Sequence, residues 1–111
     1  MANFTVVSGN LGKDPEPFYT QEGGVFCSLD LAFRSYGDKT NWIRASCKDR
    51  LAEACLEHLE KGSKVVVAGV LDQTKWEDDQ GNQRTSFRVL ANSVDFLGPP
   101  PRRANATATT S

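Results

Sequence analysis

Aromatic side chains stand beside basic ones at three places in the chain. Each group suits single-stranded nucleic acid, because an unpaired base stacks on an aromatic ring for roughly 1–3 kcal/mol while Lys and Arg neutralise phosphates. Duplex DNA does not offer its base faces in this way. The groups are Tyr36 with Arg34 and Lys39, Trp42 with Arg44 and Lys48, and Trp76 with Lys75, Arg84 and Arg88.

The tryptophans also have a second interpretation. Trp42 falls on the polar face of the alternating segment TNWIRASC, beside Arg44 and Ser46. A large ring on a wet strand face must cover something, which can be a neighbouring element, a partner subunit or a ligand. On the residues alone, a subunit contact and base stacking both stay open.

Catalytic and metal chemistry lack the residues they need. The stretch GNLGKD matches neither a Walker loop nor a G-x-G-x-x-G loop. Cys27, Cys47 and Cys55 have no C-x-x-C spacing and the chain has a single histidine, so we expect buried thiols and no metal site. Asp78 and Asp79 stand at an expected hairpin tip, where acids are usually solvated. We predict that the protein is not an enzyme and needs no cofactor.

Charge is segregated along the 111-residue chain, although the formal net charge is only −1. Residues 34–48 carry four basic residues against one acid, and residues 49–60 carry four acids against one Arg. A basic surface can therefore exist on a nearly neutral protein. The chain has no apolar run near the ~18 residues of a membrane span, and its start resembles no secretory signal. We expect a cytoplasmic protein.

Periodicity predicts a mainly β domain with one helix. VFCSLDLAFR alternates apolar and polar residues, which is typical of a half-buried strand. DRLAEACLEHLEKG predicts a helix over residues 49–62, with Asp49 as N-cap and Gly62 as its stop. Gly69 predicts a bend or bulge in the strand that follows. Strand patterns cover residues 4–9, 17–20, 25–34, 40–47, 64–76 and 84–97.

This element order is that of an OB fold, although the periodicities alone support any small α+β or all-β domain and leave an SH3-like barrel open. We predict a five-stranded antiparallel barrel, with the helix between the third and fourth main strands and the brief run 17–20 as an addition. Residues 1–97 would form this domain. Residues 98–111, which begin with Pro and Arg and have low hydrophobicity, would form a disordered tail.

The sequence resembles the bacterial-type single-stranded DNA-binding proteins. Matching stretches, in the family's order, are GNLGKDPE, YTQEGG, LDLAF, TNWIR, LAEACLEHLEKGSKVVVAGVL, KWEDDQGNQR and VDFL. The resemblance implies an OB fold, sequence-tolerant binding of single-stranded DNA in replication, repair and recombination, location at the nucleoid, and a homotetramer built as a dimer of dimers.

The resemblance also implies roles for individual residues. Trp42 and Trp76 match base-stacking tryptophans, and Tyr36 lies near a third aromatic position. The N-terminal strand, residues 3–7, would help to form the dimer contact. Phosphate contacts are implied for residues at commonly basic positions, namely Arg44, Arg50, Lys61, Lys75 and Arg84.

The chain departs from the family's pattern at three places. Lys48 stands where an aromatic residue is usual, and Phe18 stands where a basic residue is common. We expect the chain to be a short member of the family, without the acidic, aromatic-ended C-terminal tip that recruits partner enzymes. Two alternatives remain open: a primosome-type dimeric OB protein that binds protein partners and nucleic acid, and an RNA-binding OB module.

Overall fold

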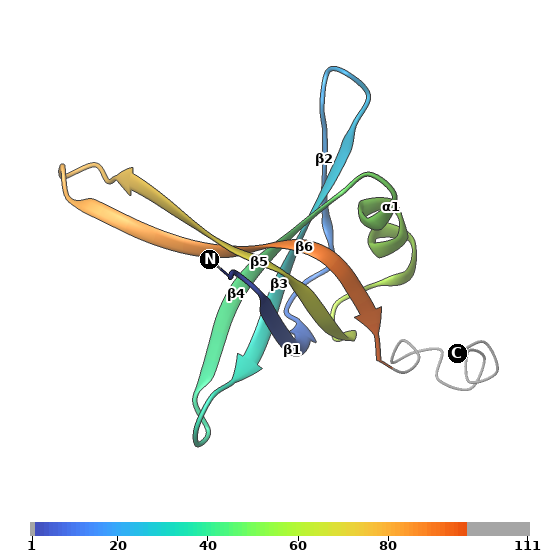
Figure 1. Ribbon diagram of the computed structural model, residues 1–111, viewed down its shortest axis with the longest axis horizontal. Coiled ribbons are helices and arrows are strands. Elements are labelled where there is room, and N and C mark those ends of the chain that lie inside the picture. The colour runs from blue at the N-terminus through green and yellow to red at the C-terminus, as the bar shows by residue number, and fades with distance from the viewer. Residues whose placement is uncertain (1, 98–111) are drawn as a thin grey trace.

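The computed structural model describes residues 2–97 and shows a mainly β domain, as predicted (Figure 1). Residues 98–111, where we expected a disordered tail, lie outside the described residues. No helix within residues 2–97 is long and apolar enough to cross a membrane. The elements are β1 (Thr5–Leu11), β2 (Glu16–Tyr19), β3 (Val25–Arg34), β4 (Thr40–Lys48), α1 (Asp49–His58), β5 (Lys64–Glu77) and β6 (Gln83–Phe96).

Five of the strands close on themselves, as the OB fold requires. The sheet order is β1-β5-β6-β4-β3-β2, and β1 also pairs with β3, so that β1, β5, β6, β4 and β3 form a ring. The structure differs from the prediction in one pairing: β4 and β6 run parallel, whereas every other pair is antiparallel. The brief run predicted at 17–20 lies one residue earlier and is a sixth strand, β2, which pairs only with β3.

The core lies inside this ring and below α1. The odd-numbered residues Cys27, Leu29 and Leu31 of β3 and Ala45 and Cys47 of β4 point inward and are buried, and among the even-numbered residues of these strands only Ser28, at 8% exposure, is buried as well. The even-numbered residues of both strands therefore share the outer face. Ala52 and Cys55 of α1 close one end of the core against β3 and β4.

The helix is shorter than predicted. It ends at His58, and Gly62, with φ of 93°, lies in the turn that follows. Asp49 is not the N-cap: Lys48 takes that place in an extended conformation without a side-chain hydrogen bond, and Asp49, with φ of 57°, is the first helical residue. Strand β4 thus passes directly into α1, and no linker remains to hold a separate cap.

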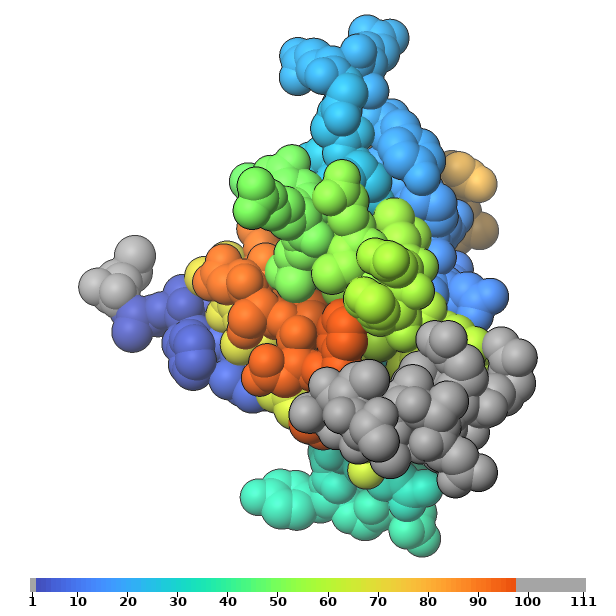
Figure 2. Space-filling view, turned by 90° about the vertical axis from the view of Figure 1, so that its right-hand side faces the viewer, coloured from blue at the N-terminus to red at the C-terminus, as the bar shows by residue number. Residues whose placement is uncertain are grey.

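Two-stranded hairpins project from the barrel. The β5–β6 arm, residues 71–87, extends beyond the pairings with β1 and β4 (Figure 1). The β5–β6 register shifts between Ala68 and Gly69, where we predicted a bend or bulge, and the residue that this shift leaves without a partner is Asn92 of β6. A Cβ on Gly69 would lie 2.1 Å from the Leu90 carbonyl oxygen. The β2–β3 and β3–β4 hairpins project at opposite ends of the body (Figure 2).

Candidate functional site

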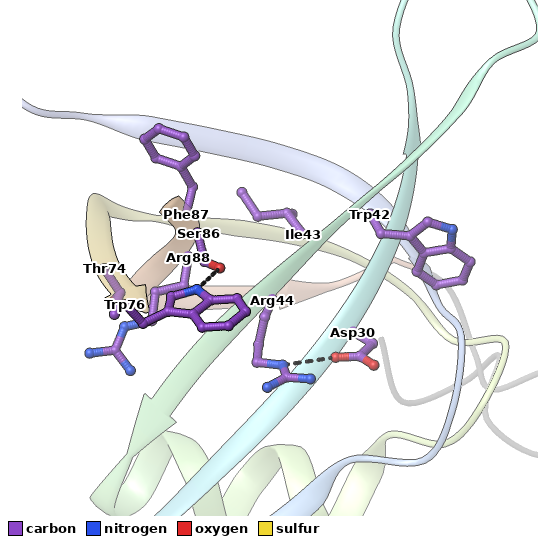
Figure 3. A pocket seen from close by; sticks show the side chains of 9 residues that line it. All are labelled: Asp30, Trp42, Ile43, Arg44, Thr74, Trp76, Ser86, Phe87 and Arg88. Carbon is purple, nitrogen blue, oxygen red and sulfur yellow. Dashed lines mark hydrogen bonds and ion pairs between the residues drawn. The ribbon is translucent and has the colours of Figure 1, made fainter. Parts of the chain in front are cut away.

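An open groove of about 550 Å³ lies between β4 and the β5–β6 arm. Its walls come from four strands, because β3, β4 and β6 are neighbours in the sheet and the arm continues past them. Figure 3 shows Arg44 between the two indole rings in this view. The lining residues are Asp30, Trp42, Ile43, Arg44, Thr74, Trp76, Ser86, Phe87 and Arg88.

Trp42 presents an open ring on the outer face of β4. It lies opposite Ala32 of β3, whose small side chain leaves the indole uncovered, and 61% of the residue is exposed. The six-membered ring lies over Gly12: a Cβ there would come within 2.4 Å of Trp42 Cζ3. Gly12 therefore leaves the space that this ring position needs.

Trp76 faces the groove from the arm. Its Nε1 donates a hydrogen bond to Ser86 Oγ at 3.1 Å, which fixes the ring while 48% of the residue stays exposed. Its cross-strand partner is Arg84. Both tryptophans thus present large apolar area to water on the same groove, where a ligand or a partner has access to it.

Three arginines on this face are each held through Nε by an aspartate. The separations are 3.3 Å for Arg44 with Asp30, 3.1 Å for Arg88 with Asp72 and 2.9 Å for Arg84 with Asp78. In each pair the arginine side chain is the more exposed. The exposed fractions are 62% for Arg44 against 27% for Asp30, 48% for Arg88 against 38% for Asp72, and 56% for Arg84 against 18% for Asp78. A guanidinium has further N–H donors at its Nη atoms, so these pairs orient the arginines and leave donors for an anion.

Asp78 shapes the arm's tip, contrary to our expectation that it is a solvated acid. Its Oδ1 accepts hydrogen bonds from the backbone N–H groups of Gln80 and Asn82, both at 2.9 Å, and its Oδ2 pairs with Arg84. The backbone hydrogen bonds and the Arg84 guanidinium lower the pKa of the Asp78 carboxyl. The carboxylate therefore belongs to the turn. Of the two tip acids, only Asp79 makes no ion pair or hydrogen bond with residues 2–97.

The remaining predicted residues lie at three other places. Tyr36 and Lys39 are in the β3–β4 loop, where Tyr36 is 99% exposed and Arg34 pairs with Asp38 at 3.8 Å. Lys48, Arg50 and Lys61 lie at the α1 end of the barrel and are exposed. Lys75 points away from Trp76, because neighbouring residues of a strand face opposite sides.

The groove also contains residues that the sequence analysis missed. Phe87 is 52% exposed, and Ser86 holds Trp76. Asp30 and Asp72 orient arginines that the sequence did identify. The alternation of TSFRV in the returning strand is the signal that could have placed Ser86 and Arg88 on one face with Trp76.

The cysteines take no part in the groove. All three are free and buried, as expected. Burial raises the pKa of the Cys27 thiol to about 12, and a hydrogen bond with Cys47, 4.0 Å between sulfur atoms, raises the pKa of Cys55. Such thiols stay protonated and unreactive at neutral pH. Within residues 2–97 no group of three or more Cys, His, Asp or Glu could hold a metal ion.

Open aromatic faces next to oriented guanidinium groups can bind flat π systems that carry negative charge. The family model described as the single-strand binding protein family matches residues 2–97, which is the whole of the described domain.

Proposed function

Because the chain belongs to the single-strand binding protein family, whose members bind single-stranded DNA and are not enzymes, we propose that bases stack on Trp42 and Trp76 in this groove. The binding is sequence-tolerant, since every base has a π face. One observation carries the proposal: two tryptophans, 61% and 48% exposed, face the same groove as Arg44 and Arg88.

The backbone of the DNA strand would be held by cations around the rings. Arg44, Arg84 and Arg88 present oriented guanidinium groups on the groove side. The β3–β4 loop adds Tyr36, Arg34 and Lys39, and the α1 end adds Lys48, Arg50 and Lys61. Lys75 would contact a phosphate only where the strand passes around the edge of the arm.

Titration with oligo-dT tests this directly, because the chain has only two tryptophans and both line the groove. We expect quenching of tryptophan fluorescence at low salt, with affinity that falls as salt rises. A duplex of the same length serves as control and should quench far less. Absence of quenching, or quenching that is indifferent to salt, contradicts the proposal.

We further propose that the protein is a homotetramer acting at the nucleoid in replication, repair and recombination. An observation on β1 supports an assembly: β1 pairs with β5 from Thr5 to Asn10, but with β3 only at Asn10 and Leu11. One edge of the strand is thus open, and Phe4 and Val6 are 76% and 53% exposed. An open edge with apolar side chains suits a second copy.

Two alternatives, a primosome-type relative and an RNA-binding module, predict different outcomes in simple measurements. A primosome-type relative would be a dimer with a short footprint, so native mass and the number of nucleotides per protomer separate it from a tetramer. An RNA-binding module would prefer oligo-rU to oligo-dT in direct competition. Recruitment of replication or repair enzymes is no part of the proposal.

A further inference from the structure

We infer that Phe18 and Phe26 form a second base-stacking platform for single-stranded DNA, on the β2–β3 hairpin. The inference rests on the proposed function and extends it to a part of the sheet outside the groove. Neither residue lines the groove, and 51% of Phe18 and 38% of Phe26 are exposed.

The two phenylalanines and one lysine form a single row across three strands. Phe18 of β2 lies opposite Phe26 of β3, and Phe26 lies opposite Lys48 of β4. Neighbouring strands are about 4.8 Å apart, so the row measures about 10 Å from Phe18 to Lys48. Two adjacent rings of this kind offer stacking area for at least one base.

The row belongs to the same sheet face as the groove. Pairing between β3 and β4 is unbroken from Phe26 and Lys48 to Ala32 and Trp42, so these even-numbered residues share a face. The adjacent odd-numbered residues, Tyr19 and Val25, instead line a hollow together with Glu53, Leu56 and Glu57 of α1. The phenylalanines therefore point away from the helix, toward the side on which Trp42 and Arg44 lie.

A bound strand would have the length to reach this row. Lys48 lies six residues along β4 from Trp42, about 20 Å at 3.3 Å per residue. An OB fold occupies about 4–16 nucleotides, and the upper part of this range exceeds what the two rings of the groove accommodate. A strand that leaves the groove along β4 meets Lys48 and the phenylalanine pair.

Charge favours DNA over a second protein copy as the occupant. Lys48 makes no ion pair within residues 2–97, and the acid on this face of β2, Glu16, is engaged by Lys13 at 3.4 Å. A protein partner that covered both rings would also desolvate the Lys48 ammonium, which is costly, whereas a phosphate would neutralise it.

Binding of two oligonucleotides to a double variant, Phe18→Thr with Phe26→Thr, tests the inference. We expect the affinity for oligo-dT of about 16 nucleotides to fall by about 5- to 150-fold for each lost stack. The affinity for oligo-dT of about 6 nucleotides, which the groove alone can hold, should be unchanged. Tyr19→Thr, on the opposite face of β2, is the matched control and should leave both affinities unchanged.

A second variant reports contact directly. In a Trp42→Phe/Trp76→Phe background, Phe18→Trp places the only indole of the chain on the β2–β3 hairpin. We expect its fluorescence to be quenched by the longer oligonucleotide and not by the shorter one. This readout does not depend on the stability of the double threonine variant.

The outcomes separate this inference from the proposed function. If wild-type tryptophan fluorescence responds to no oligonucleotide, the proposed function fails and this inference fails with it. If wild-type protein binds but the double variant keeps full affinity for the longer strand, or Phe18→Trp is not quenched, only this inference is overturned. A smaller native mass for the double variant without DNA also overturns it and assigns the rings to a contact between copies.

Discussion

At the scale of single residues, the site consists of side chains whose positions are fixed while their binding atoms stay open. Ser86 holds Trp76 through Nε1 and leaves the ring face in solvent. Asp30 and Asp72 hold Arg44 and Arg88 through Nε and leave the Nη donors without a partner among residues 2–97. Side chains ordered before binding lose less entropy when the ligand arrives.

Removal of one ring should weaken binding without loss of the fold. We expect Trp76→Ala to cost roughly 1–3 kcal/mol in affinity for oligo-dT, because a stacked base loses its platform. Thermal unfolding should change little, since the residue is 48% exposed. Trp76→Phe is the matched control: it removes the bond to Ser86 but keeps a ring, and it should retain most of the affinity. A collapse of thermal stability in Trp76→Ala would make the residue structural.

Gly12 should matter only through the ring above it. Gly12→Ala brings a Cβ within 2.4 Å of Trp42 Cζ3, so we expect the indole to move and the affinity to fall. The measurement is a double-mutant cycle with Trp42→Ala. Once the ring is gone, Gly12→Ala should have no further effect. Additive losses would show that Gly12 acts on binding by another route.

At the scale of elements, the β5–β6 arm is stabilised by the irregular pairing at its base and by the hydrogen-bonded turn at its tip. A two-stranded ribbon is only marginally stable in water by itself. Gly69 allows the close approach to Leu90 where the arm leaves the barrel, and Asp78 joins Gln80, Asn82 and Arg84 at the other end.

Loss of the Asp78 carboxylate, by protonation or by substitution, should loosen the tip. Its pKa is lowered in the folded protein, so its contribution is present above the ordinary value of 3.8 and is lost as pH falls through the lowered pKa. We expect the amide protons of Gln80 and Asn82 to lose protection from hydrogen exchange in Asp78→Ala at neutral pH. Asp79→Ala is the matched control and should keep that protection. Equal exchange in both variants would remove Asp78 from this role.

A side chain at Gly69 should destabilise the whole domain. The Cβ of Gly69→Ala would meet backbone atoms of Leu90 and Ala91, which cannot rotate away. Overpacking of this kind typically costs about 1–3 kcal/mol in free energy of unfolding, measured by urea denaturation. An unchanged midpoint would mean that the bulge relocates without strain.

The sequence predicted those elements whose information is local. Alternation placed the β3 and β4 faces correctly and put Trp42 beside Arg44, and the segment predicted as the helix, 49–62, contains α1 at Asp49–His58. The parallel pairing of β4 with β6 was not predictable, because periodicity carries no information about which distant strand is the neighbour. The role of Asp78 was missed for a similar reason: its bond to Arg84 depends on the register across the turn.

At the scale of the whole molecule, a chain with a net charge of −1 is expected to bind a polyanion. The structure gives part of the reason. Acids on the proposed binding face are paired with cations, as in Asp30 with Arg44, whereas Glu53 and Glu57 are exposed on α1, beside the opposite face. Local charge, not the total, decides the attraction at short range, because salt screens distant charges.

The dependence of affinity on salt should report individual cations. A single-stranded ligand gives a slope of about −0.7 in log affinity against log salt for each neutralised phosphate. We expect Lys48→Ala to make the slope shallower by about 0.7. Lys64→Ala, an exposed lysine at the start of β5 outside the proposed site, is the control and should leave the slope as it is. An unchanged slope for Lys48→Ala would exclude a phosphate contact there.

The central claim is that bases lie on Trp42 and Trp76, and photo-crosslinking tests it most directly. Bromodeoxyuridine in an oligonucleotide forms covalent bonds on irradiation with aromatic side chains that it touches, and mass spectrometry of the digested protein identifies the peptides. We expect adducts at Trp42 and Trp76, lost when excess unlabelled oligo-dT competes. Adducts confined to α1 or to β1, with both tryptophans unmodified in a saturated complex, would contradict the account.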